Sequence, residues 1–194
     1  MRLHFPGLAR ERLLWGCQHM KRAIVATLLL CGAILALVTS PALATGVHLS
    51  SAEKQVLTLV NQQRAAHHLA PLRAQASLFR SARAHTDNMA TVPFFSHDSP
   101  NGSTPGERAI AAGYTTRGCR SWMIGEAIAW GSAGYASPAQ IVRGWMKSPP
   151  HRAILLGRSF RDVGIGVAVG AYQDAGLRLD DVTYFTLDVG QRTH

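Results

Sequence analysis

The sequence predicts a single α+β domain that follows an N-terminal export segment. Apolar residues recur at helical spacing through the first part of the domain, and two β-branched segments lie near its end. The chain has 194 residues, of which 47% are hydrophobic, and it carries both signs of charge. These values fit one globular domain of ordinary size together with a segment that is removed.

The export segment is recognised by the order of its parts. Lys21 and Arg22 precede an apolar run over residues 23–38, and Ala42 and Ala44 then form an A-x-A pattern. A basic start, an apolar run and small residues at the cleavage site are typical of a secretory signal peptide. The run has about 16 residues, fewer than the ~20 that span a bilayer.

We therefore expect residues 1–44 to be a signal peptide that is cleaved after Ala44, so that the protein is secreted or periplasmic. The stretch ahead of Met20 is long for the basic start of a signal, which makes Met20 the expected true start. Residues 45–51 are expected to be a linker and residues 52–190 the folded domain. An uncleaved N-terminal membrane anchor is the alternative.

The positive charge of the chain is divided between these parts. The formal net charge is +9, and the first 44 residues account for +4 of it with five Lys or Arg and one acid. The remainder is mildly basic at +5, and its arginines are not interleaved with aromatic residues. We therefore expect no nucleic-acid partner. Weak attraction to an anionic membrane surface or wall polymer stays open.

The cysteines agree with export but predict no disulfide. Cys17 and Cys31 fall in the segment that is expected to be removed, which leaves Cys119 alone in the domain. The domain must therefore be stabilised by its core, and we expect a monomer.

Four helices and two strands are expected in the domain. The helices are placed over residues 52–67, 77–91, 104–112 and 137–146, and the strands over residues 163–169 and 182–189. Residues 172–181 between the strands are expected to form a polar loop or a hairpin connection. Pro149 and Pro150 are expected to end the last helix and to leave His151 on a turn.

Three ionisable residues stand out because their neighbours are aromatic or small and apolar. They are His97, Glu126 and His151. Imidazole and carboxylate groups bind divalent cations or move protons near neutral pH. Glu126 is the least surface-like acid of the domain, and it must be paired, protonated or bound to a cation if it is buried. The alternative for Glu126 is a structural ion pair, for example with Arg108.

His85 is the third histidine to consider. It shares an apolar helix face with Leu78, Ala82 and Met89, since the four residues follow one another at helical spacing. A hydrogen-bonded core histidine is the favoured interpretation, and a ligand is the alternative.

Five motifs in a fixed order give the chain a resemblance to a known family. They lie at residues 61–64 (N-x-x-R), 95–98 (F-S-H-D), 125–129 (G-E-A-I-A), 145–152 (W-M-K-S-P-P-H-R) and 164–166 (G-x-G). In this order they resemble the CAP superfamily, the cysteine-rich secretory proteins, antigen 5 and pathogenesis-related 1 proteins, and above all its bacterial secreted branch. The resemblance covers about residues 52–189.

This resemblance implies an α-β-α sandwich around a small antiparallel sheet. It also implies a ligand-binding cleft with two histidines and two acids, in which some members hold a divalent metal. His97, Glu126 and His151 match three of these positions, and Ser148 stands where the family usually has the second Glu. A second departure is Ala127 in place of an Asn, and the disulfides of eukaryotic members are absent.

Three functions follow as hypotheses, in addition to a purely structural role for the three residues. The first is a site formed by His97, Glu126 and His151 that binds a cation, Zn in preference to Mg or Ca because the second acid is missing, or a small ligand. The second is an extracellular hydrolase, metal-dependent or using Ser96 or Ser148. Since neither serine lies in a G-x-S-x-G motif, an enzyme is not the favoured interpretation and no catalytic residue is assigned.

The third hypothesis is a secreted, non-enzymatic binder of lipid, sterol or cell-envelope material, as the resemblance implies for several relatives. A groove for such a ligand would be lined by aromatic side chains, namely Phe94, Phe95, Trp122, Trp130 or Tyr135. The same aromatic residues are equally typical of a protein core.

Overall fold

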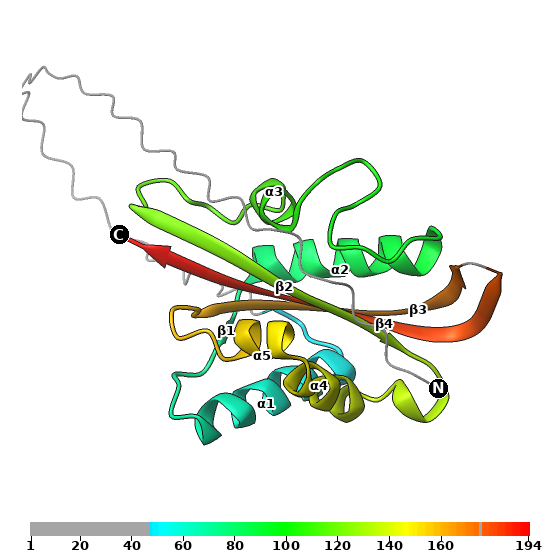
Figure 1. The fold of residues 1–194 in the computed structure, drawn as a ribbon. Coiled ribbons are helices and arrows are strands. Elements are labelled where there is room, and N and C mark those ends of the chain that lie inside the picture. The colour runs from blue at the N-terminus through cyan, green and yellow to red at the C-terminus, as the bar shows by residue number, and fades with distance from the viewer. Residues whose placement is uncertain (1–46, 175) are drawn as a thin grey trace, which may run out of the picture.

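The fold is a four-stranded sheet between two layers of helices, in a computed structural model that describes residues 47–174 and 176–194 (Figure 1). In chain order the elements are α1 (Ser51–Ala66), β1 (Arg73–Ala74), α2 (Ala76–Thr91), α3 (Pro105–Ala111), β2 (Ser121–Gly131), the 3-10 helix η1 (Ala133–Tyr135), α4 (Pro138–Lys147), α5 (Pro149–Leu155), β3 (Asp162–Asp174) and β4 (Leu177–Thr193).

The strand order of the sheet is β1-β3-β4-β2. The long strands β2, β3 and β4 are antiparallel, and β4 pairs with β2 from Ser121↔Thr193 to Gly131↔Thr183. The two-residue strand β1 adds a short parallel pair to β3. The α-β-α sandwich is thus confirmed, with a sheet that is antiparallel except at this edge.

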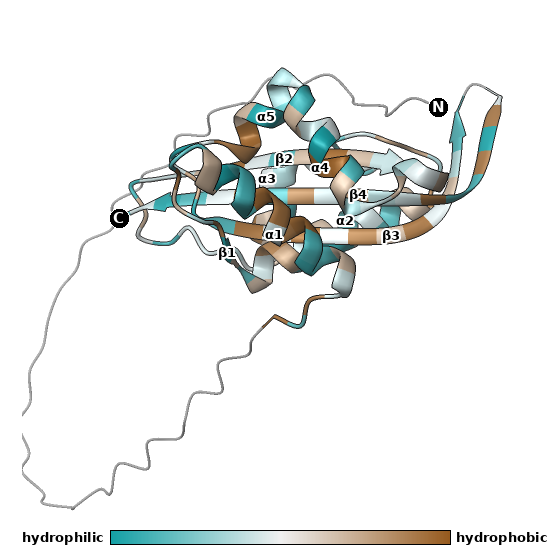
Figure 2. Ribbon diagram, turned by 90° about the horizontal axis from the view of Figure 1, so that it is seen from below, coloured by the Kyte–Doolittle hydropathy of each residue, from teal (hydrophilic) through white to brown (hydrophobic). Residues whose placement is uncertain are grey.

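The helices α1, α4 and α5 cover one face of the sheet and α2 and α3 cover the other (Figure 1). On the α1/α4/α5 face the core is apolar, and hydrophobic residues mark the strands and the helices that cover them (Figure 2). Its largest members include Trp145, Phe160, Phe185, Ile141 and Ile165. Burial of such side chains is the main stabilising term of the fold.

Two motif residues fix the loops on this apolar face. Asn61 accepts a hydrogen bond from the backbone N–H of Leu72 and donates to its carbonyl. Arg64 is fully buried and donates to the carbonyl oxygens of Ala70, Leu155, Gly157 and Phe160. The N-x-x-R motif therefore ties α1 to the connections before β1 and before β3.

The four expected helices are confirmed, but one prediction in the second half of the chain is wrong. The prolines Pro149 and Pro150 do not leave His151 on a turn, because they occupy the first turn of α5, where a missing N–H is harmless. Of the two alternatives for residues 172–181, the hairpin connection is confirmed, because β3 and β4 continue as paired strands through most of this range.

The strand β2, which carries Glu126, was not predicted from the sequence. Its residues from Gly125 to Gly131 are buried on both faces, so the alternation that reveals a half-exposed strand is absent. The predicted signal peptide and its cleavage after Ala44 lie outside the described residues. Among the residues that are described, no helix is long and apolar enough to cross a membrane.

Candidate functional site

Glu126 lies at the centre of a buried polar site on the α2/α3 face of the sheet. On the central part of β2 the side chains alternate, so that Ala127 and Ala129 join the apolar core and Glu126 and Ile128 face the other layer. Glu126 is almost fully buried, with 1% of its side chain exposed. Such a carboxylate must have charged or hydrogen-bonding partners.

His97 and Arg108 are those partners. His97 Nδ1 donates to Glu126 Oε1 at 2.8 Å, and Arg108 Nη2 donates to Glu126 Oε2 at 2.5 Å. Burial alone would raise the pKa of Glu126, but the hydrogen bond from His97 and the charge of Arg108 lower it below its usual value. Glu126 is therefore an ionised carboxylate at neutral pH.

Arg108 also holds the loop that carries His97. From α3 its Nη1 donates to the carbonyl oxygens of His97 and Ser103, both at 2.8 Å. The ion pair with Arg108 that was the structural alternative for Glu126 is thus present, and it exists together with the contact to His97.

The ring of His97 is oriented by Glu126. A carboxylate can only accept, so the proton on the contacting nitrogen must be at Nδ1, and the lone pair of the neutral ring lies at Nε2. His97 Nε2 is buried and has no hydrogen-bond partner in the part of the chain that the structure describes. The free lone pair is the feature of His97 that suits a cation or another hydrogen-bond donor.

His151 lies in the first turn of α5, and its electrostatic interaction with His97 connects it to this site. Its Nδ1 shares a 2.8 Å hydrogen bond with Ser148 Oγ, and the residue is 1% exposed. Burial, and to a smaller extent the repulsion that a protonated His97 would exert, lower the pKa of His151 to about 4. His151 is therefore neutral at pH 7, and Ser148 orients it at the position where the family usually has an acid.

A second buried acid, Asp188, was not identified from the sequence. It lies opposite Glu126 in the β2–β4 register, is fully buried, and faces Ser81 and Glu126. Burial, followed by the charge of Glu126, raises the pKa of Asp188 well above its usual value. Its only signal in the sequence was one charge within the apolar run of the last strand.

His85 is the core histidine that was favoured over a ligand. It is fully buried on α2, with Nε2 3.0 Å from the carbonyl oxygen of Ser96 and Nδ1 3.3 Å from Ser99 Oγ. Burial lowers its pKa, so His85 stays neutral. Its two contacts support the backbone on both sides of His97.

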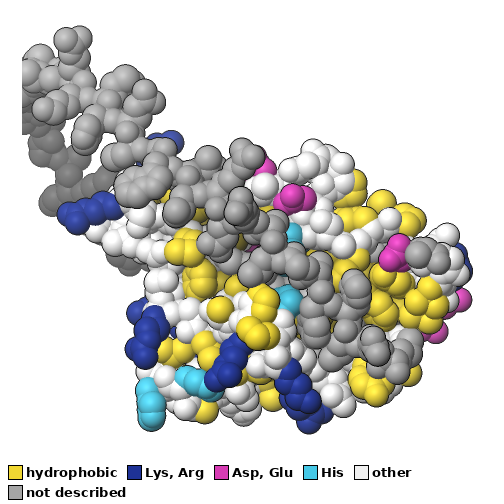
Figure 3. All heavy atoms as spheres, in the orientation of Figure 1, with side chains coloured by type: hydrophobic (Ala, Val, Ile, Leu, Met, Phe, Trp, Pro, Cys, Tyr) yellow, Lys and Arg dark blue, Asp and Glu magenta, His cyan; other side chains and the backbone are white. Residues whose placement is uncertain are grey.

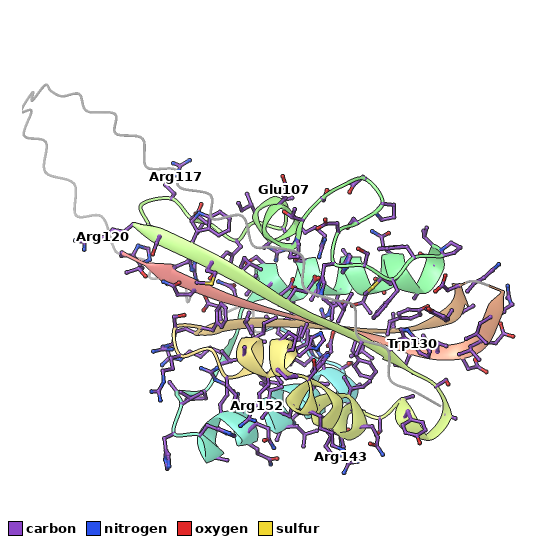
Figure 4. The ribbon with its side chains drawn as sticks, viewed as in Figure 1. Glu107, Arg117, Arg120, Trp130, Arg143 and Arg152 are labelled. Carbon is purple, nitrogen blue, oxygen red and sulfur yellow. The ribbon has the colours of Figure 1, made fainter. Side chains whose placement is uncertain are left out.

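The candidate aromatic residues do not form one group. Phe94, Phe95 and Trp130 pack in a cluster around Tyr184 on the α2/α3 face, and Trp130 stacks on Tyr172 at the far end of β2 (Figure 4). Of the other two aromatic residues, the ring of Trp122 lies beside Gly106 at the start of α3, and Tyr135 in η1 is exposed.

The residues fit a metal ion only as a pair of histidines. Among the residues that the structure describes, no three His, Cys, Asp or Glu side chains are arranged to hold a metal ion. Both oxygens of Glu126 accept hydrogen bonds from His97 and Arg108, so Glu126 serves as a support for His97 in this arrangement. The donors that these residues would offer are imidazole nitrogens, which suit Zn better than Mg or Ca.

The fold agrees with a comparison with known proteins. Residues 57–189 match the CAP family, described as the cysteine-rich secretory protein family. The match covers well over half of the chain, and the chain therefore belongs to this family.

Individual relatives are bacterial proteins. The chain is 32% identical over 117 residues to the uncharacterized protein YkwD of Bacillus subtilis, which covers 60% of this chain and 42% of the relative. It is 26% identical to an extracellular protein with an SCP domain from Bacillus anthracis, with a TM-score of 0.55, covering 71% of this chain and 39% of that one. The chain thus spans less than half the length of either relative.

A further solved structure shows the fold alone. An outer surface protein of Borrelia burgdorferi is 18% identical, with a TM-score of 0.59, and the match covers 76% of this chain and 97% of that protein. The sandwich of the present chain thus resembles nearly the whole of a solved chain of this fold.

Proposed function

We propose that this protein is an extracellular CAP-domain protein that binds a divalent cation through the Nε2 atoms of His97 and His151. The observation that carries the proposal is the buried lone pair at His97 Nε2, which is fixed in place because Glu126 holds the opposite ring nitrogen. A histidine that donates its other N–H to a carboxylate is the common arrangement of metal-binding histidines.

The charges of the site support a borderline cation such as Zn. The charges of Glu126 and Arg108 compensate each other, and His151 is neutral at pH 7. The site therefore offers polarisable nitrogen donors and little net negative charge, which disfavours a hard cation such as Ca. Glu126 and Ser148 would hold the two rings in position, and a bound Zn would supply a Lewis acid with open positions for water or a small ligand.

The extracellular location rests on two observations. The N-terminal sequence has the order of a signal peptide, and a relative that is 26% identical is described as an extracellular protein. N-terminal sequencing of the protein recovered outside the cytoplasm tests this, with a start at Thr45 expected.

Calorimetric titration with zinc tests the cation site. The wild-type protein is expected to bind one ion, and His97→Ala and His151→Ala are each expected to weaken binding roughly tenfold or more, as the loss of a metal ligand or its support does. His48→Ala, which removes an exposed histidine, is the matched control. Equal affinity of all four proteins would contradict the proposal.

The contact between Ser148 and His151 supports a second candidate, a serine hydrolase. Neutral His151 at 2.8 Å from Ser148 Oγ could act as a general base. Glu126 contacts His97, so it does not play the part of the orienting acid of a triad. Labelling by a fluorophosphonate probe that is lost in Ser148→Ala would favour this candidate, and absence of labelling in the folded wild type would remove it.

A further inference from the structure

The outer surface of the α1/α4/α5 layer is basic. Exposed cations from distant parts of the sequence gather on it, and Figure 3 shows them over the lower part of the molecule, while the visible acids lie over its upper part and the β3–β4 hairpin. They include Lys54 of α1, Arg143 and Lys147 of α4, and Arg152 of α5.

On α1, α4 and α5 no exposed acid balances these cations. Residues 138–161, which contain α4 and α5, have no Asp or Glu at all. The single acid of α1 is Glu53, which is buried and forms a two-pronged ion pair with Arg83, at 2.6 and 2.7 Å. The face therefore has an uncompensated positive charge that attracts anions.

Two apolar furrows cross this basic face and adjoin each other. The first lies between α1 and α4, with Leu59 and Val142 among its lining residues and Arg143 and Lys147 beside them. The second runs from α4 to α5. It shares Met146 and Lys147 with the first furrow and adds Arg152, Ala153 and Leu156. We call the two adjoining furrows together the channel, and its floor is apolar and its rim is basic.

One rim cation is held in position. Arg152 Nη2 donates to His67 Nε2 at 3.3 Å, and His67 Nδ1 donates to the carbonyl oxygen of Gln63 at 2.8 Å. Gln63 itself lines the first furrow. The guanidinium is thus fixed between α5 and α1, which lowers the entropy lost when it binds an anion.

The chemistry of this face points to one kind of polyanion. The most exposed large hydrophobic residues of the described part lie on other elements, so this face has no side chain ready to enter a bilayer. Within the described residues it also has no exposed aromatic ring on which a nucleobase could stack. Sugar rings, by contrast, have apolar C–H faces that fit a shallow apolar floor and can carry carboxylates to a basic rim.

We propose that the channel formed by the two furrows binds a linear acidic polysaccharide. The carboxylates of the polymer pair with Arg143, Lys147 and Arg152, and its sugar rings lie on the apolar floor. Arg143 and Arg152 lie on the helical layer, whereas Arg117 and Arg120 lie at the opposite end of the molecule (Figure 4). The proposal is independent of cation binding at His97 and His151.

Fluorescence anisotropy with labelled polygalacturonate tests the proposal. The triple variant Arg143→Glu/Lys147→Glu/Arg152→Glu is expected to bind roughly tenfold or more weakly, and the slope of log K against log salt should fall by about three. The triple variant Arg117→Glu/Arg120→Glu/Arg178→Glu makes the same change in net charge at positions elsewhere and should change affinity less than about threefold. Equal losses in the two variants would overturn the proposal.

Three other ligands test the class of partner. Neutral dextran is expected not to bind, and polyglutamate, which has carboxylates without sugar rings, is expected to bind more weakly than polygalacturonate. Phosphatidylglycerol vesicles should bind no more tightly than polyglutamate. Polyglutamate or vesicles binding as tightly as polygalacturonate would overturn the assignment to a polysaccharide.

A neutral substitution examines the floor of the channel. Ala153→Leu fills the second furrow without a change in charge, at an exposed helix position where Leu is a good helix former. We expect binding of polygalacturonate to weaken about threefold and binding of polyglutamate to stay the same. An equal response of the two polymers would contradict a role for the floor, and thermal unfolding of each variant reports its folding.

Discussion

The two faces of the sheet differ in what they bury. Along the same strand β4, Phe185, Leu187 and Val189 enter the apolar core under α1, α4 and α5. Between them, Thr186 and Asp188 point to the opposite face and are fully buried beneath α2. One strand thus contributes to an apolar layer on one side and to a polar layer on the other.

This difference separates stability from chemistry. Apolar burial stabilises the fold on one face, where each side chain needs only the right volume. The other face holds Glu126, Asp188 and Arg108, whose burial is favourable only while every partner is present. The candidate site therefore depends on a scaffold that gains its stability elsewhere.

The largest expected effect comes from the buried arginine on the apolar side. Arg64→Ala removes all four hydrogen bonds to backbone carbonyls and leaves these buried acceptors unpaired. We expect the free energy of unfolding to fall by about 4 kcal/mol in urea denaturation. The stability of Asn61→Ala, which loses two hydrogen bonds, is expected to fall by about 2 kcal/mol. A larger loss in Asn61→Ala than in Arg64→Ala would contradict this expectation.

The second largest effect is expected from the Glu126–Arg108 ion pair on the polar side of the sheet. Glu126→Gln keeps the shape of the side chain but leaves Arg108 as a buried charge without its carboxylate. The free energy of unfolding should fall by about 3 kcal/mol, as measured by urea denaturation at pH 7. The double variant Glu126→Gln/Arg108→Met serves as the control, because removal of both charges should restore part of the loss. Equal stability of the single variant and the wild type would show that the ion pair is unimportant.

A pair of glycines compares the backbone packing of the two faces. A Cβ on Gly164 would lie 2.0 Å from the backbone of Leu78 in α2, so Gly164→Ala must push the helix away. On the opposite face, a Cβ on Gly125 would lie 3.2 Å from the side chains of Phe160 and Val189, which can adjust. We expect the free energy of unfolding to fall by about 2–3 kcal/mol in Gly164→Ala and by less than about 1 kcal/mol in Gly125→Ala. Thermal unfolding of both variants measures these losses, and a larger loss in Gly125→Ala than in Gly164→Ala would contradict the prediction.

His151 is expected to make the free energy of unfolding depend on pH. Its folded pKa of about 4 is below the unfolded value of 6.5, so the unfolded chain binds more protons between these values. The contribution of His151 is therefore fully present above pH 6.5 and is lost as the pH falls towards 4. We expect a loss of about 1–2 kcal/mol that is absent in His151→Gln. If the free energies of unfolding of the wild type and His151→Gln fell in parallel from about pH 7 to pH 4, this prediction would be wrong.

Substitution of Asp188 is expected to change stability least. The contribution of Asp188 to stability falls as the pH rises, whereas that of His151 falls as the pH drops. The folded pKa of Asp188 is raised, so the folded state holds the proton more tightly, and this stabilisation is lost as the pH rises above the unfolded value of about 4. Asp188→Asn cannot ionise and should be as stable as the wild type or up to about 1 kcal/mol more stable at about pH 8. A marked loss of stability at this pH, like that of Glu126→Gln, would mean that ionised Asp188 is needed.

Much of the fold and part of the site could be predicted from local patterns. Helical spacing located α1 to α4, and an acid in an apolar stretch pointed to Glu126. The same method failed for β2, because a strand that is buried on both faces shows no alternation. It misplaced His151 because a Pro-Pro pair can begin a helix as well as end one.

The sequence by itself determined the family, the order of the motifs and the three residues His97, Glu126 and His151. Only the tertiary structure decided how they are connected. It paired Glu126 with Arg108 and placed Asp188 against it across the β2–β4 register. It also gathered dispersed cations onto one helical face. Periodicity describes neighbours along the chain, whereas these contacts join residues that are far apart in sequence and meet only when the sheet and helices pack together.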